Sequence, residues 1–281
     1  MGSVKPWHFY KRETFNAIFN ALQSDEILAN IYTGKEYRER VKSALITLGQ
    51  DFLYEHWQKV ANLFAYEGKT GSVEIADLTK SVTAEAKGQI IIINLSEADA
   101  PGNILWSDDI RMIVINEFLE SLSREAQAVY KQDKTLNTLV ILDEAHRLAP
   151  RERQENPEFD RVKNTLKDAV RTTRKYGLGW MFVSQTLSSL DREIINQIRV
   201  YVFGFGLAYG IELQALREII GGNEEAISLY QLFKDPQSTP KQKEYSFMTI
   251  GPISPLSFSG IPLFFQALQY PAEFVRTNFP S

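Results

Sequence analysis

Two adjacent carboxylates at the end of an apolar run are the residues of this chain best placed to do chemistry. Asp143 and Glu144 directly follow the short run 138–142, which has the composition of a strand buried on both faces. In a Walker B strand, the Asp holds Mg²⁺ and the Glu polarises the attacking water. The pattern therefore predicts ATP hydrolysis at these two carboxylates. A plain strand end, where the chain meets solvent, is the alternative.

A second polar group follows the next predicted strand. Gln185 comes after the apolar run 180–183. The carboxyl ends of neighbouring parallel strands face one crevice, so we expect Gln185 beside Asp143 and Glu144. A Gln amide at that place can hydrogen-bond both the attacking water and the γ-phosphate, and so sense whether hydrolysis has occurred. The alternative is a polar residue that only caps its strand.

The helix predicted at 158–176 carries basic residues beside its apolar face. A solvated charged face is the common explanation of such a row. Arg171 or Arg174 can equally reach a phosphate of a neighbouring subunit, as an arginine finger does, and the sequence does not choose between them. The apolar face holds Val162, Leu166, Ala169, Val170 and Thr173, and the basic row holds Lys163, Lys167, Arg171 and Arg174.

A phosphate-binding loop of the form G-x-x-x-x-G-K-[ST] is the missing part of such a site. Its glycines let successive backbone N–H groups converge on the phosphates, and its Lys meets their charge. The tripeptide 68–70, Gly-Lys-Thr, resembles only its end, because Leu63 stands where the first Gly belongs and the residues before it have a helical pattern. We interpret this match as coincidental and not as a phosphate-binding loop.

Composition narrows the class of protein. The 281 residues contain no Cys and three His, which excludes disulfides and thiolate metal sites and makes a His-rich metal site improbable. The net charge of -4 shows no global basic excess, so any DNA contact must be local. No apolar run reaches the roughly 18 residues of a membrane helix, and we expect a cytoplasmic protein without a membrane segment.

The order of patterns predicts an α/β fold with a doubly wound, mostly parallel sheet. Apolar strands at 90–95, 138–143, 180–185 and 200–205 alternate with helical patterns, as in right-handed βαβ units. A further strand is expected at 245–250. We divide the chain into a helical subregion of the ATPase domain (4–86), an α/β ATPase core (87–251) and a proline-rich, extended C-terminal arm (252–281).

Three segments, taken in order, resemble the FtsK/HerA class of P-loop motors, and HerA-like ATPases above all. They are 139–146, 170–179 and 182–190. The segment 90–96 is similar to the HerA strand that ends in Asp-Leu-Ser before Walker B, although Asn94 stands in place of the Asp. Conjugation and type IV secretion ATPases are related to the same class.

The resemblance implies a RecA-like P-loop fold and a homo-hexameric ring that uses ATP and Mg²⁺ to move double-stranded DNA, often beside a NurA-like nuclease. Asp143 would then serve Mg²⁺, Glu144 the catalytic water and Gln185 the sensor role, with Arg171 or Arg174 acting on a neighbour's site. It also implies that a β-barrel domain and the Walker A loop precede residue 1, and that this portion alone is inactive.

Two other functions stay open. A conjugation or type IV secretion motor that moves protein or DNA–protein substrates would share the fold and the ATP chemistry, but duplex DNA would not stimulate its turnover. A non-hydrolysing scaffold would be favoured if Met1 were the natural start, because the protein would then contain no P-loop.

Overall fold

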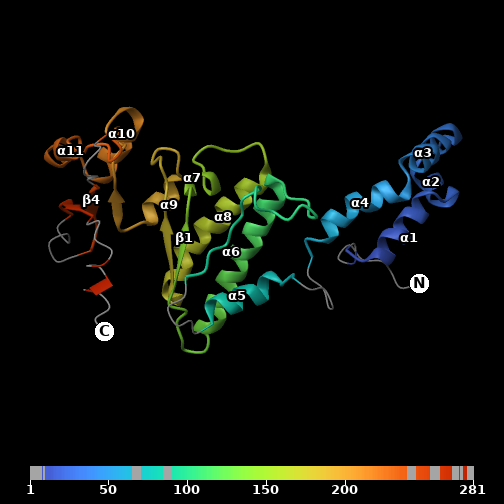
Figure 1. Cartoon of the computed structure of the whole chain (residues 1–281), viewed down its shortest axis with the longest axis horizontal. Coiled ribbons are helices and arrows are strands. Elements are labelled where there is room, and N and C mark those ends of the chain that lie inside the picture. The colour runs from blue at the N-terminus through green and yellow to red at the C-terminus, as the bar shows by residue number, and fades with distance from the viewer. Residues whose placement is uncertain are drawn as a thin grey trace. The chain divides into compact units, whose positions relative to one another are not determined.

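A computed structural model of the chain describes residues 8, 10–64, 71–84, 90–238, 245–253, 260–267, 272, 275 and 276. The chain divides into two compact units, Met1–Glu125 and Ala126–Ser281. Figure 1 shows the chain, coloured from blue at the N-terminus to red at the C-terminus, and labels many of its helices and strands. The tripeptide 68–70 and most of the predicted arm lie outside the described residues.

The first unit begins with helices, as the sequence predicts. The residues between its early helices explain where these helices begin and end. The Ser24 hydroxyl caps the start of one helix by accepting the Ile27 N–H, and Gly49, with a φ of 71°, separates two others. Phe15, Trp57 and Ala61 form a small buried cluster. The helices are α1 (Arg12–Leu22), α2 (Asp25–Ile31), α3 (Lys35–Leu48), α4 (Gln50–Ala61) and α5 (Ile75–Thr83).

The predicted strand at 90–95 is wrong in this structure. The segment is neither helix nor strand, and Ile90 and Ile92 are 91% and 86% exposed. A strand needs a hydrogen-bonded neighbour, and no described residue forms a ladder with this segment. Asn94 instead bonds locally: its Oδ1 accepts the Ser96 N–H at 2.9 Å and its Nδ2 donates to Asp99 at 2.8 Å.

Helix α6 (Asp108–Tyr130) starts where the sequence predicts, and it crosses the division between the units. The Ser107 hydroxyl accepts the Ile110 N–H at 3.4 Å, and Asp108 and Asp109 lie in the first turn, where acids suit the positive end of the helix dipole. None of the helices that the structure describes combines the length and the apolar character needed to cross a membrane.

A parallel strand pair forms the centre of the predicted βαβ unit. Strands β1 (Thr138–Leu142) and β2 (Leu178–Phe182) pair in register from one end to the other. Helices α7 (Ala145–Leu148) and α8 (Pro157–Thr172) and the 3₁₀-helix η2 (Thr173–Tyr176) connect them. The expectation that β1 is covered on both faces is wrong for this structure, because Leu139 and Ile141 are each 59% exposed.

The remaining strands form a separate antiparallel sheet, in which the order is β3 (Tyr201–Phe203), β4 (Ser246–Ile250) and β5 (Leu263–Gln266). The chain is therefore α/β, but the described residues do not extend the parallel pair into a doubly wound sheet. Strand β5 also lies in the arm predicted to be irregular. Its Pro262 precedes the strand, which is a place in a sheet that tolerates proline.

A buried cluster joins the second sheet to the helices around it. Helices α9 (Arg192–Gln197), α10 (Gly210–Ile219) and α11 (Glu224–Tyr230) follow β2 and flank β3 in the sequence. Members of the cluster come from β3, β4, α10, α11 and the turns between them. They are Phe203, Ala208, Leu216, Ile220, Ala226, Ile227, Tyr230 and Met248.

Gly177 leads the chain into β2, and we expect Gly177→Ala to lower the free energy of unfolding by about 3 kcal/mol. Its φ is +79°, and an added Cβ would lie 2.9 Å from the Asn137 backbone nitrogen and 3.0 Å from that of Leu136. The chain would have to move apart where Thr138 N donates to the Gly177 carbonyl at 3.0 Å.

Urea denaturation measures this effect, with Gly221→Ala as the matched control. Gly221 has φ +67°, but no described atom outside its neighbours lies within 4 Å of an added Cβ, so its loss reflects backbone strain alone, about 1 kcal/mol. Equal losses in the two variants would contradict the predicted clash at Gly177.

Tyr230 makes the free energy of unfolding depend on pH in the alkaline range. Its hydroxyl accepts the Leu207 N–H at 3.0 Å and donates to the Gly204 carbonyl, and burial raises its pKa above the ordinary 10.0. The folded protein thus keeps the phenol proton to higher pH than the unfolded chain. This contribution to stability is complete below pH 10 and is lost as pH rises through the raised pKa.

We expect the free energy of unfolding to fall above about pH 10, and to fall less steeply in Tyr230→Phe. The variant is also about 1–2 kcal/mol less stable at neutral pH, because the Leu207 N–H loses its acceptor. Denaturation across pH 7–11 measures both effects, and Tyr209→Phe, at an 81% exposed position, is the control. Identical slopes for wild type and Tyr230→Phe would contradict the prediction.

Candidate functional site

The carboxyl ends of β1 and β2 bring Glu144 and Gln185 together. Pairing continues beyond the strands, since Val183 N donates to the Leu142 carbonyl and Ala145 N donates to the Val183 carbonyl, both at 2.9 Å. Across this junction, Gln185 Nε2 donates to Glu144 Oε1 at 2.6 Å. The structure therefore shows the proximity that parallel pairing predicts for these two side chains.

Glu144 has a backbone conformation that is rare for its residue type. Its φ is 50° and its ψ is 42°, in the left-handed region, which costs an L-residue about 1–2 kcal/mol. Asp143 Oδ1 accepts the Glu144 N–H at 2.9 Å and helps to hold this turn. Non-glycine residues in such conformations cluster at functional sites, where the surrounding structure holds them. The turn at Asp143 and Glu144 directs the chain from the end of β1 into α7.

His146 also belongs to this cluster, although no role was predicted for it. Its Nδ1 lies 3.4 Å from Glu144 Oε2 and 3.1 Å from the Ser184 hydroxyl. Glu144 is thus held at one carboxylate oxygen by Gln185 and approached at the other by His146. His146 lies within α7, two residues after Glu144, and this position alone carried no signal of its contact with the Glu144 carboxylate.

Asp143 is exposed at the same end of β1, and only its Oδ1 bonds to a described residue. The described residues contain no cluster of three or more acidic or His side chains that would hold a metal alone. Mg²⁺ is commonly held by one or two carboxylates together with waters and substrate phosphates. A single exposed Asp at this place therefore fits the donor set of a nucleotide-bound Mg²⁺.

The basic row on α8 serves mainly internal contacts. Lys163 is buried, with Nζ 3.0 Å from Asp160 Oδ1. Lys167 Nζ lies 2.8 Å from Glu193 Oε1 and 3.6 Å from Asp191 Oδ2. The hydrogen bond to Glu193 and the charge of Asp191 raise the pKa of Lys167, against the opposing effect of desolvation.

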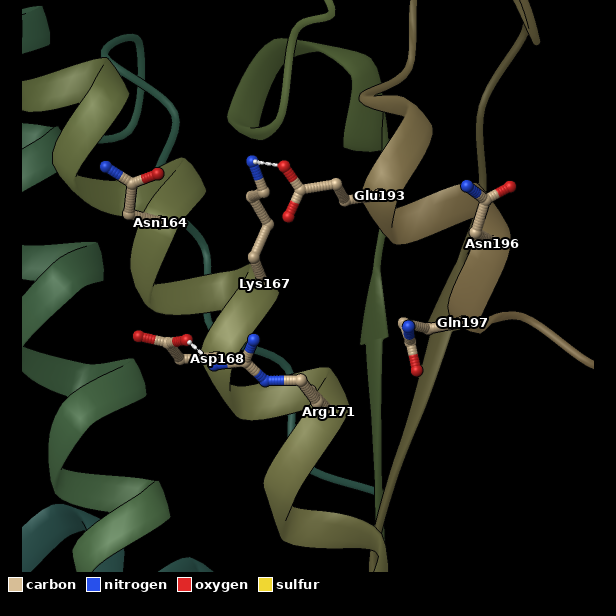
Figure 2. Close-up of a pocket in the computed structure, with 7 residues that line it drawn as sticks. All are labelled: Asn164, Lys167, Asp168, Arg171, Glu193, Asn196 and Gln197. Carbon is tan, nitrogen blue, oxygen red and sulfur yellow. Dashed lines mark hydrogen bonds and ion pairs between the residues drawn. The ribbon is translucent and has the colours of Figure 1, made fainter.

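Figure 2 shows the pocket of about 300 Å³ between α8 and α9 that Lys167 and Arg171 line. Lys167 points to Glu193 across the pocket, whereas Arg171 bonds within its own helix, with Nη2 2.7 Å from Asp168 Oδ1. Both cations of the pocket are therefore paired with an acid. The other lining residues are Asn164, Asn196 and Gln197.

Arg171 and Arg174 lie away from the cluster at Glu144. They precede β2, whereas Glu144 and Gln185 follow the carboxyl ends of β1 and β2. The five paired residues between these ends span about 13 Å. The Arg174 guanidinium is exposed and has no ion pair or hydrogen bond with a described residue. The structure thus brings Asp143, Glu144 and Gln185 together and separates both arginines from them.

Comparison with known proteins finds no family model and no curated protein that matches the chain. Among solved structures, this chain is similar to the genome packaging NTPase B204 from Sulfolobus turreted icosahedral virus 2. The complex with ATP-gammaS is 18% identical with a TM-score of 0.37, and the match covers 54% of this chain and 62% of that one. The AMPPCP complex is 17% identical with a TM-score of 0.37, covering 55% and 63%. The match thus spans less than two thirds of these NTPase chains.

Proposed function

We propose that this chain carries the Walker B and sensor elements of an ATP-driven motor of the HerA-like type. The observation that carries the proposal is the 2.6 Å hydrogen bond between Gln185 and Glu144 at the carboxyl ends of two parallel strands. In open α/β sheets, ligands bind outside this end of the strands. The left-handed backbone of Glu144 adds to the case, because strain of this kind persists where function requires it.

In this proposal, Glu144 is the group that polarises the attacking water. Its carboxylate accepts a hydrogen bond from the water, which polarises the O–H bond and makes the oxygen a better nucleophile for the γ-phosphorus. Gln185 orients the same water through its amide, which can donate and accept at once. His146 restrains the second oxygen of Glu144, which lies 3.4 Å from Nδ1. The direct bond between Glu144 and Gln185 opens when the water binds between them.

Asp143 would hold Mg²⁺ with ATP in place. When bound there, the ion would neutralise charge on the phosphates during hydrolysis. The phosphate-binding loop, in the same proposal, comes from a segment outside the described residues. The exposed apolar face of β1, with Leu139 and Ile141, supports a further layer of helices over that face, as a doubly wound, RecA-like sheet would have.

The separation of Arg171 and Arg174 from Glu144 supports a ring. If either arginine serves a nucleotide, that nucleotide belongs to a neighbouring subunit, and the proposed homo-hexamer would place the arginine there. The proposed substrate is double-stranded DNA, which the ring moves through its channel. A NurA-like nuclease is the partner that such a translocase would serve.

ATP turnover by the complete gene product, measured with and without duplex DNA, tests the proposal. Turnover that duplex DNA stimulates supports the translocase. Turnover that does not respond to DNA would instead identify a conjugation or secretion motor. No turnover under either condition would overturn the proposal and favour a non-hydrolysing scaffold.

A further inference from the structure

The segment that carries Gln185 has no regular helix or strand of its own. It lies between the end of β2 at Phe182 and Asp191, the N-cap of α9. Gln185 itself is exposed, so burial does not hold its amide in place. Any group that holds this segment therefore determines whether Gln185 reaches Glu144.

Glu212 holds the segment from the first turn of α10. Its Oε2 accepts the backbone N–H of Leu187 at 2.7 Å and that of Ser188 at 3.1 Å. Its Oε1 accepts the Ser188 hydroxyl. Hydrogen bonds to a charged acceptor are about twice as strong as neutral ones, and three of them converge on this one half-buried carboxylate. The clamp begins two residues after Gln185.

A second set of contacts forms a turn around Gln185. The Ser184 hydroxyl donates to the Thr186 carbonyl at 2.8 Å and accepts the Thr186 N–H at 3.3 Å. Gln185 is the residue between these two partners. It thus lies in a small turn between Ser184, which His146 contacts, and Leu187, which binds Glu212.

The position of Glu212 is well fixed because α10 packs into the buried core of the second sheet. Leu216 and Ile220 belong to the cluster that includes Phe203 and Met248 of β3 and β4. Leu187, whose N–H binds Glu212, packs against the same cluster. The position of the sensor segment is therefore set by a helix that contributes no side chain to the cluster at Glu144.

We infer that Glu212 is the positioning residue for Gln185, and that it acts on hydrolysis through Gln185 alone. This inference rests on the proposed function. It assigns a role to an acid far along the sequence from either predicted motif, with no direct contact to the water or the phosphate.

A double-variant experiment on ATP turnover tests the route of this effect. Glu212→Gln keeps the shape and removes the charge, so kcat is expected to fall about tenfold with KM for ATP unchanged, because the sensor is misplaced while nucleotide binding is kept. In the Gln185→Ala background, Glu212→Gln is expected to cause no further loss. Glu218→Gln, an exposed acid on the same helix, is the control. Losses that multiply in the double variant would overturn the inference.

NMR of the Gln185 side-chain amide tests the same inference without turnover. In Glu212→Gln, its resonances are expected to move toward those found in Glu144→Ala, and the Leu187 and Ser188 amides are expected to exchange at least tenfold faster. An unchanged Gln185 resonance would overturn the positioning role even where the protein hydrolyses ATP. Absence of turnover with the expected NMR change would instead reject the proposed function and leave the clamp in place.

Discussion

Glu144→Gln is expected to reduce ATP turnover about a thousandfold and to leave ATP binding intact. The amide has nearly the shape of the carboxylate, but it cannot accept a proton from the water or polarise it as an anion does. The hydrogen bond from Gln185 at 2.6 Å can be kept by the new amide oxygen, so the fold around the junction should survive. The change thus removes the proposed chemistry with little change in shape.

Turnover and nucleotide affinity should be measured on the same preparations, because the prediction separates them. Glu218→Gln makes the same chemical change at an exposed position on α10 and is expected to have wild-type turnover. Full activity in Glu144→Gln would show that Glu144 is not the group that activates water. Loss of ATP binding together with turnover would point to a structural role for the carboxylate.

The sequence was most predictive where local pattern and topology agreed. A helical crossover joins the run 138–142 and its two acids to the later run that ends near Gln185. A crossover of that kind favours parallel pairing, which the structure shows. Parallel pairing alone then places Glu144 beside Gln185. Neither His146 nor Glu212 could be found this way. Their roles depend on the left-handed turn at Glu144 and on where α10 packs, and no short-range pattern encodes either.

The failed predictions share a different cause. A β-branched run such as 90–95 shows only that a segment is suited to a strand. Whether it becomes one depends on residues elsewhere in the chain, which must supply the hydrogen-bonded neighbour. Strand β3 shows the same limit. Its apolar residues suited a parallel neighbour, yet its described partner is β4, in antiparallel register from Tyr201 to Phe203. Apolar composition did not predict the direction of this partner, and of the three residues of β3 only Phe203 is buried, whereas Val202 is 55% exposed.

Arg174→Ala is expected to lower ATP turnover about a thousandfold, within the range that arginine fingers contribute. We favour Arg174 over Arg171 because Arg171 is already bonded to Asp168 at 2.7 Å, whereas the Arg174 guanidinium has no partner among the residues that the structure describes. Arg171→Ala is the matched control and should have a small effect. Arg174→Lys should not restore activity, since an ammonium cannot reproduce the planar fork of a guanidinium.

Mixing two inactive variants tests whether Arg174 acts on a neighbour. Glu144 and Arg174 lie at opposite ends of the strand pair, about 13 Å of strand apart, so they cannot serve one site from one subunit. When Glu144→Gln and Arg174→Ala proteins are mixed, some interfaces join an intact Glu144 to an intact Arg174 of the adjacent subunit. Turnover should therefore reappear in the mixture. If it does not, although the subunits exchange, Arg174 does not act between subunits and the ring proposal loses its main structural support.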